Sequence, residues 1–220
     1  MNPRVFASCA AVLCLLGGCT ALRTATAPPP SFYSLDKAGA RGGAVAVPSS
    51  SAPTLMLSPP HGAAGFDSPR MLYLRQAHQR EYFAHSEWVD TPARMLAPLM
   101  VAALANSGAF RAVVLTPSAA NGELRLDTEI LRLEQDFATT PSRVHFTLRA
   151  WLVTTKSRRV VAWRDFDESA PAETDDPRGG VLAANRAVQG VLASLAGFCA
   201  DAAGQWQREA AISPGGQGVR

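Results

Sequence analysis

The chain has 220 residues, of which 47% are hydrophobic, and it carries 21 Lys and Arg against 18 Asp and Glu. A chain of this length can bury one good core as a single domain. The net charge is only +3, which argues against nucleic acid as a partner, because binding it requires a concentrated basic face.

The N-terminal segment has the pattern of a lipoprotein signal peptide. A single basic residue precedes an apolar stretch, which ends in the tetrad Leu16-Gly17-Gly18-Cys19. The tetrad looks like a lipobox, in which small residues expose the bond to the peptidase and the cysteine sulfur takes a diacylglycerol. We therefore expect cleavage between Gly18 and Cys19, removal of residues 1–18, and diacylglycerol and N-acyl chains on Cys19.

Two alternatives are an ordinary signal peptide with an incidental cysteine and a retained helical anchor. The apolar stretch is shorter than the roughly 20 residues that a membrane-spanning helix needs. Processing at Cys19 discards Cys9 and Cys14, so Cys199 has no partner for an intramolecular disulfide. Thr20 stands where an Asp would retain the lipoprotein in the inner membrane, which indicates sorting to the outer membrane.

The mature chain divides into three parts. Residues 19–31 are the lipidated N-terminus and a Pro-rich flexible tether, residues 32–208 are one α+β domain, and residues 209–220 are a disordered tail. Apolar residues predict a first short strand at 32–35 and a second at 55–57, which a Pro-Pro pair ends.

A hairpin and a helix follow. Strand-forming residues flank a polar centre over residues 71–88, which predicts two paired strands. Thr91 can cap a helix whose first turn accepts Pro92, because the missing N–H would be unpaired there. We expect this helix to run to about Ser107, where Gly108 suits the left-handed stop.

Four further elements complete the domain. A short strand is predicted at 109–115, and the clearest strand begins at Leu124, where apolar and charged residues alternate. The phase of this alternation reverses after Ile130, which indicates a β-bulge. Two more strands are predicted, at 144–152 and 160–166. Apolar residues then recur at helical spacing from Gly180 onward and predict a long closing helix.

These elements predict an α+β fold. Because the later strands follow each other through short turns, we expect an antiparallel β-sheet with two α-helices packed on one face. The other face of such a sheet can remain open to water or to a partner.

The sequence offers little that points to catalysis. It contains no glycine-rich phosphate-binding motif and no nucleophile elbow, and we expect no enzyme, although a periplasmic hydrolase is a weaker alternative. His78, Glu81 and His85 are spaced for a helix but lie in a predicted strand, so solvated hairpin residues are a better interpretation than a metal site. Asp175 and Asp176 similarly indicate a solvated acidic loop rather than a cation site.

Aromatic and arginine side chains gather in the predicted hairpin, and these residue types are enriched where proteins bury a partner. The alternative is that half of them pack under the first helix. Trp151 and Trp163 fall out of phase with the buried residues of their strands, which places them on the free sheet face. The candidate partner interface in the hairpin is Tyr73, Arg75, Tyr82, Phe83 and Trp88.

The order of these segments resembles a known family. The lipobox, the short strand 32–36, the segment 82–90 (Tyr-Phe-Ala-His-Ser-Glu-Trp-Val-Asp), the strand 124–137 and the closing helix follow one another as in ABC-type transport auxiliary lipoproteins. This group includes paraquat-inducible protein C. The resemblance spans nearly the whole mature chain, and the segment before the first helix is its most telling part.

The resemblance implies a non-enzymatic accessory of an MCE-type lipid transport system, anchored at the periplasmic face of the outer membrane. Its implied partner is the MCE-domain protein, while an ATPase and a permease in the inner membrane supply the energy for phospholipid movement. A ring-shaped partner would suit a symmetric homo-oligomer. The alternative is a structural or assembly lipoprotein for an outer-membrane barrel of the lipopolysaccharide-export type.

The lipid anchor gives a first prediction. A triacylated cysteine carries several acyl chains and anchors firmly, whereas a chain without them has no membrane attachment. Cys19→Ala should therefore release the protein into the soluble periplasmic fraction and abolish transport. Fractionation of cells expressing the variant measures this, and retention of the variant in the membrane fraction would contradict the tether.

Overall fold

The structure is a computed structural model that describes residues 29–36 and 48–212. The expected signal peptide, Cys19 and most of the tether lie outside the described residues, as do residues 213–220. The elements in chain order are β1 (Ser31–Tyr33), β2 (Thr54–Leu57), β3 (His61–Gly62), β4 (Arg70–Gln76), β5 (Gln79–Trp88), α2 (Pro92–Asn106), β6 (Ala112–Leu115), β7 (Leu124–Asp136), β8 (Arg143–Thr154), β9 (Val160–Pro171) and α3 (Pro177–Ile212).

The sheet is organised around β7. One edge of β7 pairs with β8 along its whole length, and β8 in turn pairs with β9. The other edge pairs with three strands in succession, which are β2, β3 and β4. The strand order is therefore β1-β5-β4-β7-β2-β6, with β3 on the same edge of β7 and with β8 and β9 on its other side.

The α+β class and the two helices agree with the sequence prediction, but the sheet is mixed rather than purely antiparallel. Pairs joined by short turns are antiparallel, namely β4 with β5, β7 with β8 and β8 with β9. The short N-terminal strands instead join their neighbours in parallel, as β1 does with β5 and as β2 does with both β6 and β7. Parallel pairing requires long crossovers, and the segment from β2 to β6, which contains α2, is one.

The alternation of β7 determines which face is buried. Leu124, Leu126 and Ile130 are fully buried, and they face the same side as the buried residues of β8. A register shift between Ile130 and Arg132 is the bulge that the phase reversal predicted. Because of this extra residue, Leu133 returns to the buried side.

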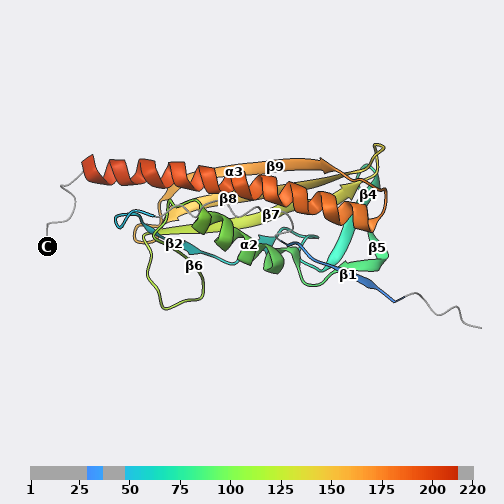
Figure 1. The fold of residues 1–220 in the computed structure, drawn as a ribbon, viewed down its shortest axis with the longest axis horizontal. Helices are drawn as coiled ribbons and strands as arrows, with labels where there is room; N and C mark the ends of the chain where they lie inside the picture. Colours follow the sequence, from blue (N-terminus) through green and yellow to red (C-terminus); the bar gives the residue numbers. More distant parts are fainter. Residues whose placement is uncertain (1–28, 37–47, 213–220) are drawn as a thin grey trace, which may run out of the picture.

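Both helices cover this one face of the sheet (Figure 1). α2 buries Leu96, Met100 and Leu104, and α3 packs along β8 and β9. The Thr91 side chain accepts from the Arg94 N–H at 3.4 Å, and Gly108 has a φ of 69°, so both ends of α2 agree with the sequence prediction.

α3 is longer than the sequence pattern indicated. It begins at Pro177 and ends at Ile212, so residues 209–212 are helical where a disordered tail was expected. Among the described helices, α3 is long and apolar enough to cross a membrane by length and composition alone. Half of its most apolar window is buried in the structure, and this side packs on the sheet, as in the core helix of a globular domain.

The start of α3 gives a stability prediction. A Cβ at Gly179 would overlap the backbone carbonyl of Thr174, whereas a Cβ at Gly197 in the same helix meets nothing within 4 Å. Gly179→Ala should therefore lower the free energy of unfolding by about 1–3 kcal/mol. Gly197→Ala should raise it by about 0.5–1 kcal/mol, because alanine favours the helix.

Urea unfolding of both variants measures the difference. The matched glycine separates a local clash from the general preference of helices for alanine. Equal stability of the two variants would contradict the tight junction between α3 and the loop before it.

Candidate docking surfaces

Among the residues that the structure describes, no helix covers the sheet face opposite α2 and α3, and we call this side the open face. Trp151 and Trp163 are direct neighbours across β8 and β9. The chain neighbours of Trp151, Ala150 and Leu152, are fully buried on the helix side, so both tryptophans point away from the helices. The open face consists of the side chains of Arg125, Asp127, Glu129, Thr147, Arg149, Trp151, Trp163, Asp165 and Asp167.

Trp163 is the most conspicuous side chain of the open face, because 61% of its surface is exposed. Trp151 beside it is half-buried. A large aromatic ring on a solvated strand is costly to leave in water, and tryptophan is enriched at the centres of protein interfaces. The two tryptophans confirm the sequence prediction for their orientation.

Charged side chains on the open face pair with one another. Arg149 donates to both oxygens of Asp165 at 2.7 and 2.8 Å, and Arg125 donates to Asp127 at 2.9 Å. The Arg149 guanidinium holds the pKa of the Asp165 carboxyl below its usual value. Such exposed pairs contribute little stability, but they leave the tryptophans among charges that already have partners.

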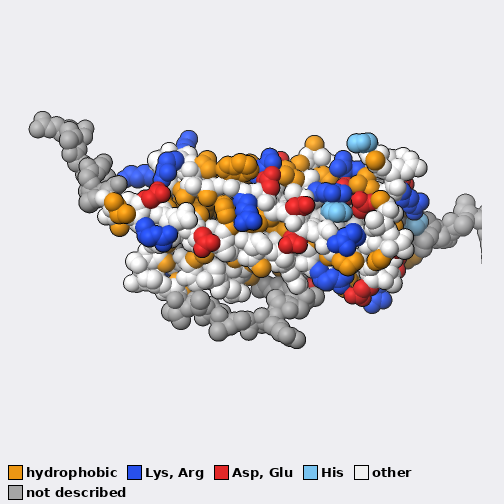
Figure 2. All heavy atoms as spheres, turned by 90° about the horizontal axis from the view of Figure 1, so that it is seen from above, with side chains coloured by type: hydrophobic (Ala, Val, Ile, Leu, Met, Phe, Trp, Pro, Cys, Tyr) orange, Lys and Arg blue, Asp and Glu red, His pale blue; other side chains and the backbone are white. Residues whose placement is uncertain are grey.

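Charge elsewhere on the surface is mixed. On the face that Figure 2 shows, basic and acidic side chains are interspersed, with hydrophobic side chains between them. This distribution agrees with the near-neutral net charge of the sequence. It lacks the concentrated basic field that nucleic-acid binding requires on the visible, described part of the surface.

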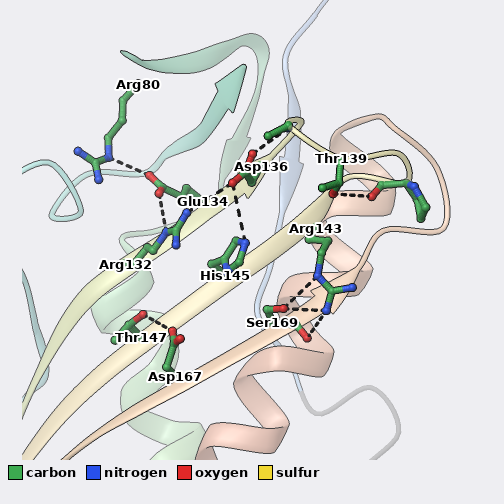
Figure 3. A network of polar contacts seen from close by, with 12 residues as sticks. Arg80, Arg132, Glu134, Asp136, Thr139, Arg143, His145, Thr147, Asp167 and Ser169 are labelled. Atoms are coloured by element: carbon green, nitrogen blue, oxygen red, sulfur yellow. Dashed lines mark hydrogen bonds and ion pairs between the residues drawn. The ribbon is translucent and has the colours of Figure 1, made fainter. Parts of the chain in front are cut away.

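A polar network ties the β4–β5 hairpin to β7 (Figure 3). The Glu134 side chain is only 1% exposed and accepts from Arg80 Nε at 2.8 Å and from Arg132 Nε at 2.6 Å. Asp136 lies 3.8 Å from Arg132 and 3.9 Å from His145. Burial, aided by the Arg132 charge, lowers the pKa of His145. A buried carboxylate that loses one partner destabilises the fold, so we assign this network to structure.

The structure divides the five hairpin residues nominated from the sequence. Tyr73 and Trp88 are buried, and the Tyr73 hydroxyl donates to Glu81 at 2.9 Å. Phe83 is half-buried, with its ring 4.6 Å from that of Tyr73. These three residues point inward, but Phe83 and Trp88 lie beside Gly180 and Ala184 of α3 rather than under the first helix.

Tyr82 and Arg75 are the members of the set that remain on the surface. Tyr82 is 54% exposed, and the Arg70 guanidinium lies 4.4 Å from the centre of its ring. Arg75 is exposed and lies 5.2 Å from the ring centre of Tyr73. Sequence reasoning did not single out Arg70, which lies two residues before Leu72, the register partner of Tyr82.

The histidines of the hairpin form no metal site. His78 occupies the turn with a φ of 67°, Glu81 accepts from Tyr73, and His85 is exposed. Within the part of the chain that the structure describes, no three His, Cys, Asp or Glu side chains lie close enough together to hold a metal ion.

The acidic pair before α3 has a structural role. Asp176 accepts from the Gly179 N–H at 2.7 Å at the start of the helix, and Asp175 accepts from the Ser142 N–H at 2.7 Å. These hydrogen bonds hold the pKa of both carboxyls below the usual value. The two residues join the loop to α3 and to the start of β8.

Solved structures share this architecture. The protein XCC0632 from Xanthomonas campestris superposes with a TM-score of 0.70 at 22% identity, over 81% of this chain and 99% of the other. A second crystal structure, of an uncharacterized protein, superposes with a TM-score of 0.58 at 13% identity, over 79% and 98% of the two chains. At these identities the likeness establishes the fold alone.

Sequence comparison identifies the family. No curated protein matches the chain. The family described as the ABC-type transport auxiliary lipoprotein component matches residues 33–196, which run from β1 into α3 and include the open face. The chain belongs to the family of ABC-type transport auxiliary lipoprotein components.

Proposed function

We propose that this protein is a non-catalytic accessory of an MCE-type phospholipid transport system. Lipid on Cys19 holds it at the periplasmic face of the outer membrane, and its domain receives the MCE-domain protein there. Membership of the auxiliary lipoprotein family supports a role beside an ABC-type transporter. The MCE partner, the lipid cargo and the outer membrane are our proposal.

The open face is the observation that carries the docking role. It combines an exposed tryptophan with charged side chains that are already paired to each other. A partner that covers Trp163 removes apolar surface from water without breaking these ion pairs. The exposed Tyr82 with Arg70 on the hairpin supplies a second pair of residue types enriched at interfaces.

An accessory role also agrees with the motifs that the sequence lacks. The sequence has no nucleotide-binding glycine motif, so the energy for transport comes from other subunits. The accessory contributes binding and position, both of which a folded domain on a lipid tether provides.

Trp163 gives the direct test. Tryptophans at the centre of an interface typically contribute about 2 kcal/mol or more to binding, so Trp163→Ala should weaken binding of the MCE-domain protein about 30-fold. Trp163→Phe should retain more of the affinity, because it keeps an aromatic ring. Binding of the purified mature chain to the MCE-domain protein of the same organism measures this.

Val160→Ala is the matched control, because Val160 lies at the start of the same strand and is 48% exposed. Both alanine variants should unfold within about 0.5 kcal/mol of the unaltered protein. Unchanged affinity of Trp163→Ala would reject the open face as the docking surface. Binding to a lipopolysaccharide-export barrel in place of the MCE protein would favour the assembly role.

A further inference from the structure

Three exposed apolar side chains surround β1, and we call them the β1 patch. Phe32 is 60% exposed, Val89 is 58% exposed and Leu182 is 42% exposed. The Val89 N–H donates to the Tyr33 carbonyl at 2.8 Å, which places Val89 beside β1. Phe32 and Leu182 line one groove of about 390 Å³ between β1 and α3. Phe32 and Leu182 thus share one groove, and Val89, which directly follows β5, lies beside the same strand β1.

Arginines flank this patch on α3. Arg178, Leu182 and Arg186 are spaced by four residues and therefore lie along one side of the helix. Arg186 lines the same groove as Phe32, and it donates to Glu173 at 2.9 Å and to the Pro171 carbonyl at 2.6 Å. Asp36 also lines the groove, so the border contains a carboxylate beside the arginines. Apolar side chains with arginines next to them match the boundary between acyl chains and anionic headgroups.

The length of the tether determines which end of the domain can meet the membrane. The 11 residues between Cys19 and Ser31 span at most about 40 Å in any conformation. α3, with 36 residues, is about 54 Å long. β1 and the first turns of α3 lie at the same end of the molecule (Figure 1), so the bilayer is held near this end.

We propose that the β1 patch rests on the bilayer that holds the acyl chains of Cys19. Phe32, Val89 and Leu182 enter the interfacial region, and Arg178 and Arg186 lie at the level of the lipid phosphates. The contact gives the domain a fixed orientation, in which α3 leads away from the membrane. This inference rests on the lipid anchor of the proposed function and adds the surface that the anchor brings to the membrane.

The experiment places a fluorescent nitrobenzoxadiazole label on single cysteines in the acylated, full mature protein. Leu182→Cys and Val89→Cys report on the patch, while Trp163→Cys on the open face and Ile212→Cys at the far end of α3 are controls. Cys199 need not be replaced, because it is fully buried and burial raises the pKa of its thiol to about 12. The protein is reconstituted into phosphatidylethanolamine–phosphatidylglycerol vesicles with and without doxyl-labelled lipid.

Doxyl lipid should quench the labels at positions 182 and 89 by about twofold or more and should leave those at 163 and 212 nearly unchanged. Vesicle flotation of the same samples separates the lipid anchor on Cys19 from the membrane contact of the β1 patch. Floating protein without quenching at 182 and 89 would overturn the patch while leaving the anchor intact. Shielding of these labels from aqueous iodide without lipid quenching would also overturn it, because a protein would then cover the patch. Protein that does not float would remove the anchor and this inference with it.

Discussion

The pairing of β7 is the constraint on which the rest of the structure depends. A single strand of 13 residues pairs with β8 on one edge and with β2, β3 and β4 in turn on the other. The bulge after Ile130 keeps apolar residues on the helix side in both halves of the strand. This same alternation sends Arg125, Asp127 and Glu129 to the other side, so one strand determines both the core and the open face.

Local patterns predicted the parts of the fold that local chemistry controls. The bulge, the Thr91 cap and the antiparallel pairs joined by short turns all follow from neighbouring residues. The parallel pairing of β1 and β2 could not be predicted in this way, because their partners lie more than 50 residues away in the sequence. Such pairs depend on the burial of the whole domain rather than on any local signal.

The candidate surface residues also fall into two groups: those whose orientation the sequence predicted and those that only the fold assigns. The orientation of Trp151 and Trp163 followed from alternation in regular strands. Residue type alone could not separate Tyr73 and Trp88 from Tyr82, and the register shifts in the hairpin interrupt the simple alternation that would assign their faces. Only the fold places the first two inside and leaves Tyr82 on the surface.

We propose that the anchored end and the docking face are different surfaces of one domain. In-cell photocrosslinking from position 163 of the lipidated protein, followed by mass spectrometry of the captured chain, tests the central claim most directly. We expect an adduct with an MCE-domain protein from position 163 and none from Leu115, an exposed residue on the edge strand β6. Capture of an outer-membrane barrel protein from position 163, or no adduct at all, would contradict it.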